Sequence, residues 1–207
     1  MKYPAVFLRS ILLVFCLFAT LPSAASAAQQ TILVFGDSLS ASYGIAREAG
    51  WVSLLQQELQ SSHTQYRVAN ASISGETTTG GLQRLNAALR QYQPAIVVLE
   101  LGANDGLRGA AISDIEANLS ALIEQSRKAG AKVLLLGIQL PPNYGLDYTA
   151  RFKNLYPKLA QQYRVSLVRF FLEGVTADQF QNDALHPDAQ AQKIILRNVL
   201  QELKPML

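Results

Sequence analysis

The sequence predicts an α/β domain in which helices cover both faces of an open parallel sheet. Short apolar segments alternate with longer amphipathic ones along the chain, and three of the five short segments are almost wholly apolar. Parallel strands are buried on both faces, so they read as continuous apolar segments. A regular alternation of strands and helices is typical of such sheets. In these folds ligands bind beyond the carboxyl ends of the strands, so the residues just after each strand are the candidates for a site.

Each predicted element follows from this alternation. The predicted strands are Thr31–Phe35, Tyr66–Ala69, Ala95–Leu101, Lys132–Ile138 and Ser166–Phe170. The predicted helices are Trp51–Gln60, Thr79–Tyr92, Ser113–Ala129, Tyr148–Tyr163 and Asp188–Leu203. Gly130 stands where a glycine that ends a helix belongs. We expect residues 28–207 to form a single domain.

The N-terminal segment, residues 1–27, has the pattern of a cleavable signal peptide. Lys2 and Arg9 form a positively charged start, and an apolar stretch from Ile11 to about Leu21 follows. The segment ends in Ala25-Ser26-Ala27, a small-x-small cleavage pattern. The apolar stretch is shorter than the roughly 20 residues of a membrane-spanning helix. We therefore expect a periplasmic or secreted protein that begins at Ala28, without a stable membrane anchor.

Composition narrows the class of function. Without residues 1–27 the chain keeps 16 basic and 15 acidic residues and has no basic cluster, so we expect no nucleic-acid partner. Cys16, the only cysteine, leaves with the signal peptide, which excludes a thiol nucleophile. Phe15 precedes it where lipidation needs a small residue, so we expect no lipid anchor. No metal-binding, phosphate-binding or dinucleotide-binding motif is present, and we expect a monomer without metal or cofactor.

A serine lies directly after the first predicted strand, in Gly36-Asp37-Ser38-Leu39-Ser40. At the carboxyl end of a strand, opening the next helix, the Ser38 hydroxyl points into the expected cleft. A plain helix N-cap serine has the same position, so position alone leaves both interpretations open.

The histidines favour the catalytic interpretation. A neutral serine needs a base near pH 7, and the chain has two histidines. His63 lies in a polar link between a helix and a strand, whereas His186 follows the last strand, at the cleft end of the sheet. Asp183, three residues earlier, is placed to orient the imidazole as the third member of a triad. The alternative for Asp183 is an Asx turn or a helix cap.

Two further loops offer donors for an oxyanion, which acyl transfer requires. Gly75, after the second strand, offers a backbone N–H, and Asn104, after the third, offers a side-chain amide. The alternatives are a turn that needs glycine for its dihedral angles and an Asx turn, respectively.

Together these segments resemble the four sequence blocks of the SGNH, or GDSL, hydrolases. They occur in the family's order and after a predicted strand each time: Gly36–Leu39, Gly75, Gly102–Asp105 and Asp183–His186. Gly102–Gly109 and Pro141–Gly145 are similar to the small secreted bacterial subgroup of thioesterase, arylesterase and lysophospholipase enzymes.

The resemblance implies a flavodoxin-like three-layer α/β/α fold with a five-stranded parallel sheet. It implies Ser38 as nucleophile, His186 as base and then acid, and Asp183 as the residue that orients it. It further implies an oxyanion hole formed by the backbone N–H groups of Ser38 and Gly75 and the side chain of Asn104. Two more aspartates in the blocks are interpreted as structural supports, namely Asp37 and Asp105.

The expected substrate is a small acyl ester or thioester. An acyl chain needs apolar walls, and the apolar candidates on loops at this face are Leu107, Pro141, Pro142, Tyr144 and Leu146, with ordinary loop packing as the alternative. An acyltransferase or a carbohydrate deacetylase would use the same triad. A peptidase and a non-catalytic binding module on the same fold are the remaining alternatives.

Overall fold

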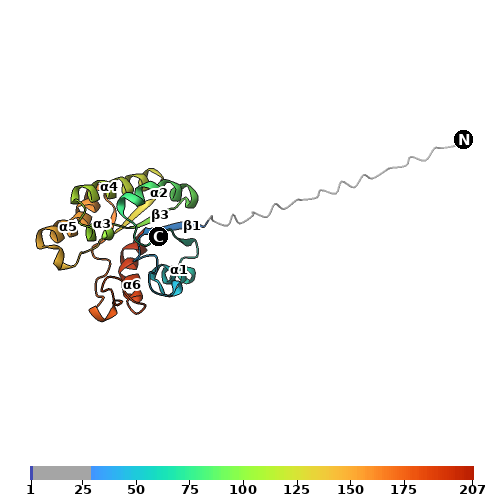
Figure 1. The fold of residues 1–207 in the computed structure, drawn as a ribbon. Coiled ribbons are helices and arrows are strands. Elements are labelled where there is room, and N and C mark those ends of the chain that lie inside the picture. Colours follow the sequence, from blue (N-terminus) through green and yellow to red (C-terminus); the bar gives the residue numbers. More distant parts are fainter. Residues whose placement is uncertain (2–28) are drawn as a thin grey trace.

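The computed structural model describes residue 1 and residues 29–207, and it confirms five parallel strands between two layers of helices (Figure 1). The strands are β1 (Gln30–Gly36), β2 (Tyr66–Asn70), β3 (Ile96–Glu100), β4 (Lys132–Leu136) and β5 (Ser166–Val168). The α-helices are α1 (Trp51–Ser62), α2 (Thr78–Tyr92), α3 (Ala103–Leu107), α4 (Ile112–Lys128), α5 (Leu146–Tyr163) and α6 (Gln192–Leu203). Short 3-10 helices are η1 (Arg47–Ala49), η2 (Pro142–Tyr144), η3 (Ala177–Gln179) and η4 (Lys204–Met206). Apart from Met1, the predicted signal peptide, with Cys16 and the predicted start at Ala28, lies outside the described residues.

The strand order, β2-β1-β3-β4-β5, places the site. From β1 the chain turns to β2 on one side and then crosses to β3 on the other. The connections therefore diverge at the carboxyl ends of β1 and β3, the point where ligands bind in doubly wound sheets. Gly36, the last residue of β1, pairs with Glu100, the last of β3, so the two strands end level with each other.

Burial on both faces explains the apolar strands. Alternate strand residues such as Leu33 and Val97 pack under α2, α4 and α5, whereas Val34 and Val98 face α1 and α6. In Figure 1 these two helix layers lie on opposite sides of the sheet. Because helices cover both faces of the sheet, the strands have no solvent-exposed face on which polar residues would alternate with apolar ones, as the sequence indicated. Among the described residues, none of the helices combines the length and the apolar character needed to cross a lipid bilayer.

Most differences from the sequence prediction lie at the ends of elements, and the short helix α3 was not predicted. The last three strands stop one or two residues before the predicted limits, and α6 begins at Gln192 because Asp188 accepts backbone N–H groups from the turn before it. The chain after Ser38 forms turns, not a helix, and the next α-helix begins at Trp51. Gly130 follows α4 with φ +87°, as expected of a glycine that ends a helix.

Candidate active site

Ser38 lies two residues past β1 on a tight turn. The backbone carbonyl of Asp37 accepts the N–H of Ala41 at 3.0 Å, and the Asp37 carboxylate accepts the N–H of Leu39 at 3.0 Å. Asp37 thus holds the turn through both its backbone and its side chain. Ser38, which follows it, is 8% exposed. Its hydroxyl donates to Nε2 of His186 at 2.8 Å, so the nucleophile and a base are already in contact.

His186 and Asp183 complete a hydrogen-bonded chain. Nδ1 of His186 donates to Oδ2 of Asp183 at 2.6 Å, which leaves Nε2 free to accept from Ser38. The backbone N–H of His186 holds the pKa of Asp183 at about 2, with the imidazole bond acting in the same direction. Asp183 is therefore ionised at neutral pH and is placed to stabilise an imidazolium.

Asp183 also forms the Asx turn that was the alternative interpretation. Its other oxygen, Oδ1, accepts the backbone N–H groups of Leu185 and His186, both at 3.0 Å. Ala184, which lies between Asp183 and Leu185, has a positive φ of 56°. The two interpretations are compatible, because one carboxylate oxygen holds the turn and the other orients the base.

Asn104 lies in α3, beside both candidate backbone donors. Its Nδ2 donates to Oδ2 of Asp37 at 3.1 Å and to the carbonyl of Glu76 at 3.0 Å. These acceptors are chain neighbours of Ser38 and Gly75. Within the described part of the chain, neither Ser38 nor Gly75 donates its backbone N–H to another residue. The Asn104 amide therefore links the segments that carry the other two predicted donors, and it is itself bonded to Asp37 and Glu76.

The loop that carries Gly75 is held from below by Arg84. The guanidinium donates to the Glu76 carboxylate at 2.5 Å and to the Ala71 carbonyl at 2.5 Å, and it lies 3.9 Å from the centre of the Phe35 ring. Gly75 itself has φ +79°, a conformation in which other residues are strained. The ion pair between Arg84 and Glu76 thus fixes the loop that carries Gly75.

A pair of buried carboxyl groups supports the nucleophile. Asp37 and Glu100 are both fully buried, and Oε2 of Glu100 accepts the Asp37 N–H at 3.2 Å and the Ser40 hydroxyl at 2.7 Å. Burial raises the pKa of Asp37 to about 6, and burial together with the charge of Asp37 raises the pKa of Glu100 well above its usual range. A Cβ on Gly36 would lie 2.6 Å from Oε2 of Glu100, so only glycine lets the carboxyl approach this closely.

A mainly apolar cavity of about 370 Å³ opens at the triad. Ser38 and His186 lie in its wall, and the remaining lining residues come from the loops after β1, β3, β4 and β5: Leu39, Ala103, Asn104, Leu107, Ile138, Gln139, Leu140, Pro141, Phe170, Leu172, Phe180, Ala184 and Leu185. An acyl chain of an ester held at Ser38 would find apolar walls here.

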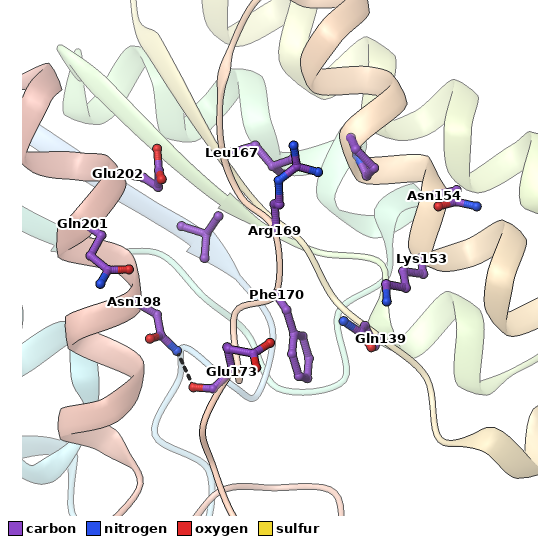
Figure 2. A pocket seen from close by; sticks show the side chains of 12 residues that line it. Gln139, Lys153, Asn154, Leu167, Arg169, Phe170, Glu173, Asn198, Gln201 and Glu202 are labelled. Atoms are coloured by element: carbon purple, nitrogen blue, oxygen red, sulfur yellow. Dashed lines mark hydrogen bonds between the residues drawn. The ribbon is translucent and has the colours of Figure 1, made fainter.

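A larger and more polar cavity, of about 560 Å³, lies beside it between α5 and α6 (Figure 2). Lys153, Arg169 and Glu202 give it charges of both signs, and it contains no member of the triad. Gln139 and Phe170 line both cavities and lie next to each other in Figure 2, so they form the shared wall. Of these two cavities, the smaller one is lined by Ser38 and His186, so it is the candidate active site.

Most of the predicted site residues meet at this face. Among the predicted apolar residues, Leu107 and Pro141 line the catalytic cavity, whereas Pro142, Tyr144 and Leu146 lie outside its lining. Leu146 is 84% exposed at the start of α5. The two aspartates that were interpreted as structural supports, Asp37 and Asp105, both bond to neighbouring segments. Asp37 is described above, and Asp105 accepts the backbone N–H and the hydroxyl of Thr78 at the start of α2.

Sequence reasoning missed four residues that shape the site. Glu100 carried a signal, because it is the one charged residue in an otherwise apolar strand segment. The other three gave none, since each acts through contacts with distant segments: Tyr43, Arg84 and Gln181.

The sequence is similar to known proteins along most of its length. The sequence model of the GDSL-like Lipase/Acylhydrolase family matches residues 34–194. "Esterase TesA" of Pseudomonas aeruginosa is 50% identical over 202 residues, which are 97% of this chain and 100% of that protein. "Thioesterase 1/protease 1/lysophospholipase L1" of Escherichia coli K12 is 42% identical over 193 residues, 92% of this chain and 91% of that one.

A solved structure shows the same fold. The psychrotrophic esterase EstA from Pseudoalteromonas sp., in a form inhibited by monoethylphosphonate, superposes with a TM-score of 0.81 at 42% identity, over 85% of this chain and 97% of that one.

Proposed function

We propose, from the premise that this chain belongs to the GDSL-like lipase/acylhydrolase family, that it hydrolyses acyl esters and thioesters through an acyl-enzyme on Ser38. Membership of the family makes the chain a carboxylic ester hydrolase that acts on small ester substrates. The observation that carries the proposal is the hydrogen-bonded chain Ser38–His186–Asp183, with distances of 2.8 Å and 2.6 Å, at the wall of an apolar cavity.

The geometry supports the usual two steps of serine catalysis. As Ser38 attacks the carbonyl carbon, its proton passes to Nε2 of His186, and Asp183 stabilises the resulting imidazolium. The carbonyl oxygen becomes an oxyanion that the N–H groups of Ser38 and Gly75 and the Asn104 amide stabilise. His186 then gives the proton to the departing alcohol or thiol. Water, activated by the same histidine, hydrolyses the acyl-enzyme and restores Ser38.

The cavity supports acyl chains as the specific part of the substrate. Burying one methylene is worth about 0.8 kcal/mol, or roughly fourfold in kcat/KM, until the cavity is full. Relatives named for esterase, thioesterase and lysophospholipase activities suggest that the leaving group varies while the acyl part is retained. We therefore expect oxygen esters, CoA thioesters and lysophospholipids with one acyl chain to be cleaved in parallel.

The test uses matched substrates and one covalent probe. Saturated acyl chains from two to sixteen carbons, as p-nitrophenyl esters and CoA thioesters, should give kcat/KM values that rise with length to a common maximum. A phosphonate ester probe should label wild-type protein and Ser61→Ala, an exposed serine on α1, but not Ser38→Ala. Esterase activity of Ser38→Ala within tenfold of the wild type would refute the role of Ser38.

The N-terminal pattern supports export of the enzyme. The segment up to Ala27 reads as a signal peptide, so the proposed working enzyme is periplasmic or secreted and starts at Ala28. Intact mass of the exported protein tests this, and a mass that retains residues 1–27 would contradict it.

A further inference from the structure

An exposed aromatic ring covers the general base. The ring centre of Tyr43 lies 4.5 Å from that of His186, with the ring planes tilted by 41°. Tyr43 is 51% exposed, so core packing does not account for its position. It lies on the turn that follows the nucleophile, and its backbone N–H donates to the carbonyl of Ser38 at 3.3 Å. The same turn therefore carries the nucleophile and covers the base.

A glutamine ties this turn to the histidine segment. Nε2 of Gln181 donates to the Tyr43 carbonyl at 2.8 Å and to the Pro187 carbonyl at 3.3 Å, and its backbone N–H donates to the His186 carbonyl at 2.8 Å. Gly44 has φ +73°, and a Cβ there would lie 2.0 Å from the Gln181 side-chain oxygen. The backbone around Tyr43 is thus shaped to receive Gln181, which fixes the ring against the imidazole.

We infer that Tyr43 is a positioning residue for His186, and the inference rests on the proposed function. Its ring keeps the imidazole turned toward Ser38, and its π face stabilises the imidazolium that forms when Ser38 attacks. The carboxylates that face the imidazole are Asp183, at 2.6 Å, and Asp37, whose charge acts on it from the end of β1. Both carboxylates are held by residues other than Tyr43, so we expect the effect of replacing Tyr43 to come from the loss of its ring.

Paired replacements separate the aromatic effect from packing. Tyr43→Phe keeps the ring and should retain most of the activity, whereas Tyr43→Leu keeps apolar cover without a π face. For Tyr43→Leu we expect kcat to fall about fivefold with little change in KM, because the imidazolium exists only after attack. Gln181→Ala, which leaves the ring in place but unties it, should give a smaller loss of kcat. Equal kcat values for the leucine and phenylalanine variants would overturn the inference.

A second measurement does not depend on turnover. The chain has two histidines, so their Cε1–H resonances can be followed by NMR, with His63 as the internal control. In a Ser38→Ala background, adding Tyr43→Leu should lower the pH midpoint of the His186 resonance by about half a pH unit, while Tyr43→Phe should not. The His63 midpoint should stay constant in all variants. An unchanged His186 midpoint would overturn the inference even if Ser38 is the nucleophile, and an active Ser38→Ala protein would refute the proposed function separately.

Discussion

Asn104→Ala tests the proposed oxyanion hole. The contacts of Asn104 predict that this replacement lowers both kcat and thermal stability, and that the two losses can be measured separately. The developing oxyanion carries charge that the substrate lacks, so removal of one donor should appear in kcat, by about a hundredfold or roughly 3 kcal/mol. Asn104 also donates to the fully buried Asp37 at 3.1 Å. Losing a hydrogen bond to a buried charged group costs about 2 kcal/mol, which corresponds to about 6 °C in Tm for a domain of this size.

The assay measures kcat, KM and Tm on one preparation, with Asn118→Ala as the control. Asn118 donates its amide to the hydroxyls of Thr78 and Thr79 near the same loop, so its loss should lower Tm with kcat within twofold of the wild type. For Asn104→Ala a fall in Tm without a fall in kcat would show that Asn104 only supports Asp37. A rise in KM by the same factor as the fall in kcat/KM would likewise refute a donor role.

Three further replacements test the buried pair, the orienting carboxylate and a backbone turn. Burial raises the pKa of Asp37 to about 6 and the pKa of Glu100 well above its ordinary value of 4.5, so both groups contribute stability below about pH 4 that is lost as pH rises through their folded-state pKa values. Glu100→Gln removes one of these two contributions, so Tm should fall less steeply as pH rises above 4.5 than it does in the wild type, and an unchanged slope by differential scanning fluorimetry would contradict this. Asp183→Asn keeps the Asx turn but removes the charge, so kcat at pH 8 should fall by at least a hundredfold with little change in Tm; a loss below tenfold would deny it an electrostatic role. Gly102→Ala would place a Cβ at φ +119° and 2.5 Å from the hydroxyl of the buried Tyr156. It should lower Tm by about 5 °C more than Gly109→Ala, where φ is +71° and no atom lies within 4 Å of the added Cβ. Equal Tm values for the two variants would show that the contact with Tyr156 does not destabilise the fold.

The strand segments and the helix layers on both faces of the sheet could be predicted because burial dictates them. A strand with both faces covered has no choice but to be apolar throughout, and the chain's five strand segments were found within two residues of their bounds. The length of β5, three residues, was overestimated because the apolar Phe170 lies close to Leu167 and Val168 in sequence, although the pairing with β4 ends at Val168. The chain after Ser38 was misassigned because the turn there is held by side chains that follow no local period.

The proximity of Ser38, His186 and Asp183 could also be predicted, because few residue types can form a serine triad and the chain offers few of them. Glu100 beneath the nucleophile could be suspected from its apolar surroundings but not assigned a role. Tyr43 and Gln181 could not be found at all, since their partners lie more than a hundred residues away in sequence and only the folded chain brings them together. Leu146 was assigned to the cavity wall from its apolar character alone, whereas it begins α5, is exposed and lies outside the lining to which Pro141 belongs.

The contact between Ser38 and His186 joins residues 148 positions apart. Ser38 follows the first strand of the chain, and His186 lies in the segment before the last helix. On the proposed function, a nascent or truncated chain carries the serine without its base, so we expect it to lack efficient ester hydrolysis until the C-terminal segment has docked beside β1. Ester hydrolysis should therefore require that the chain is synthesised to its C-terminal segment and folded. After denaturation, we expect activity to return at the rate of the slowest step that forms long-range contacts.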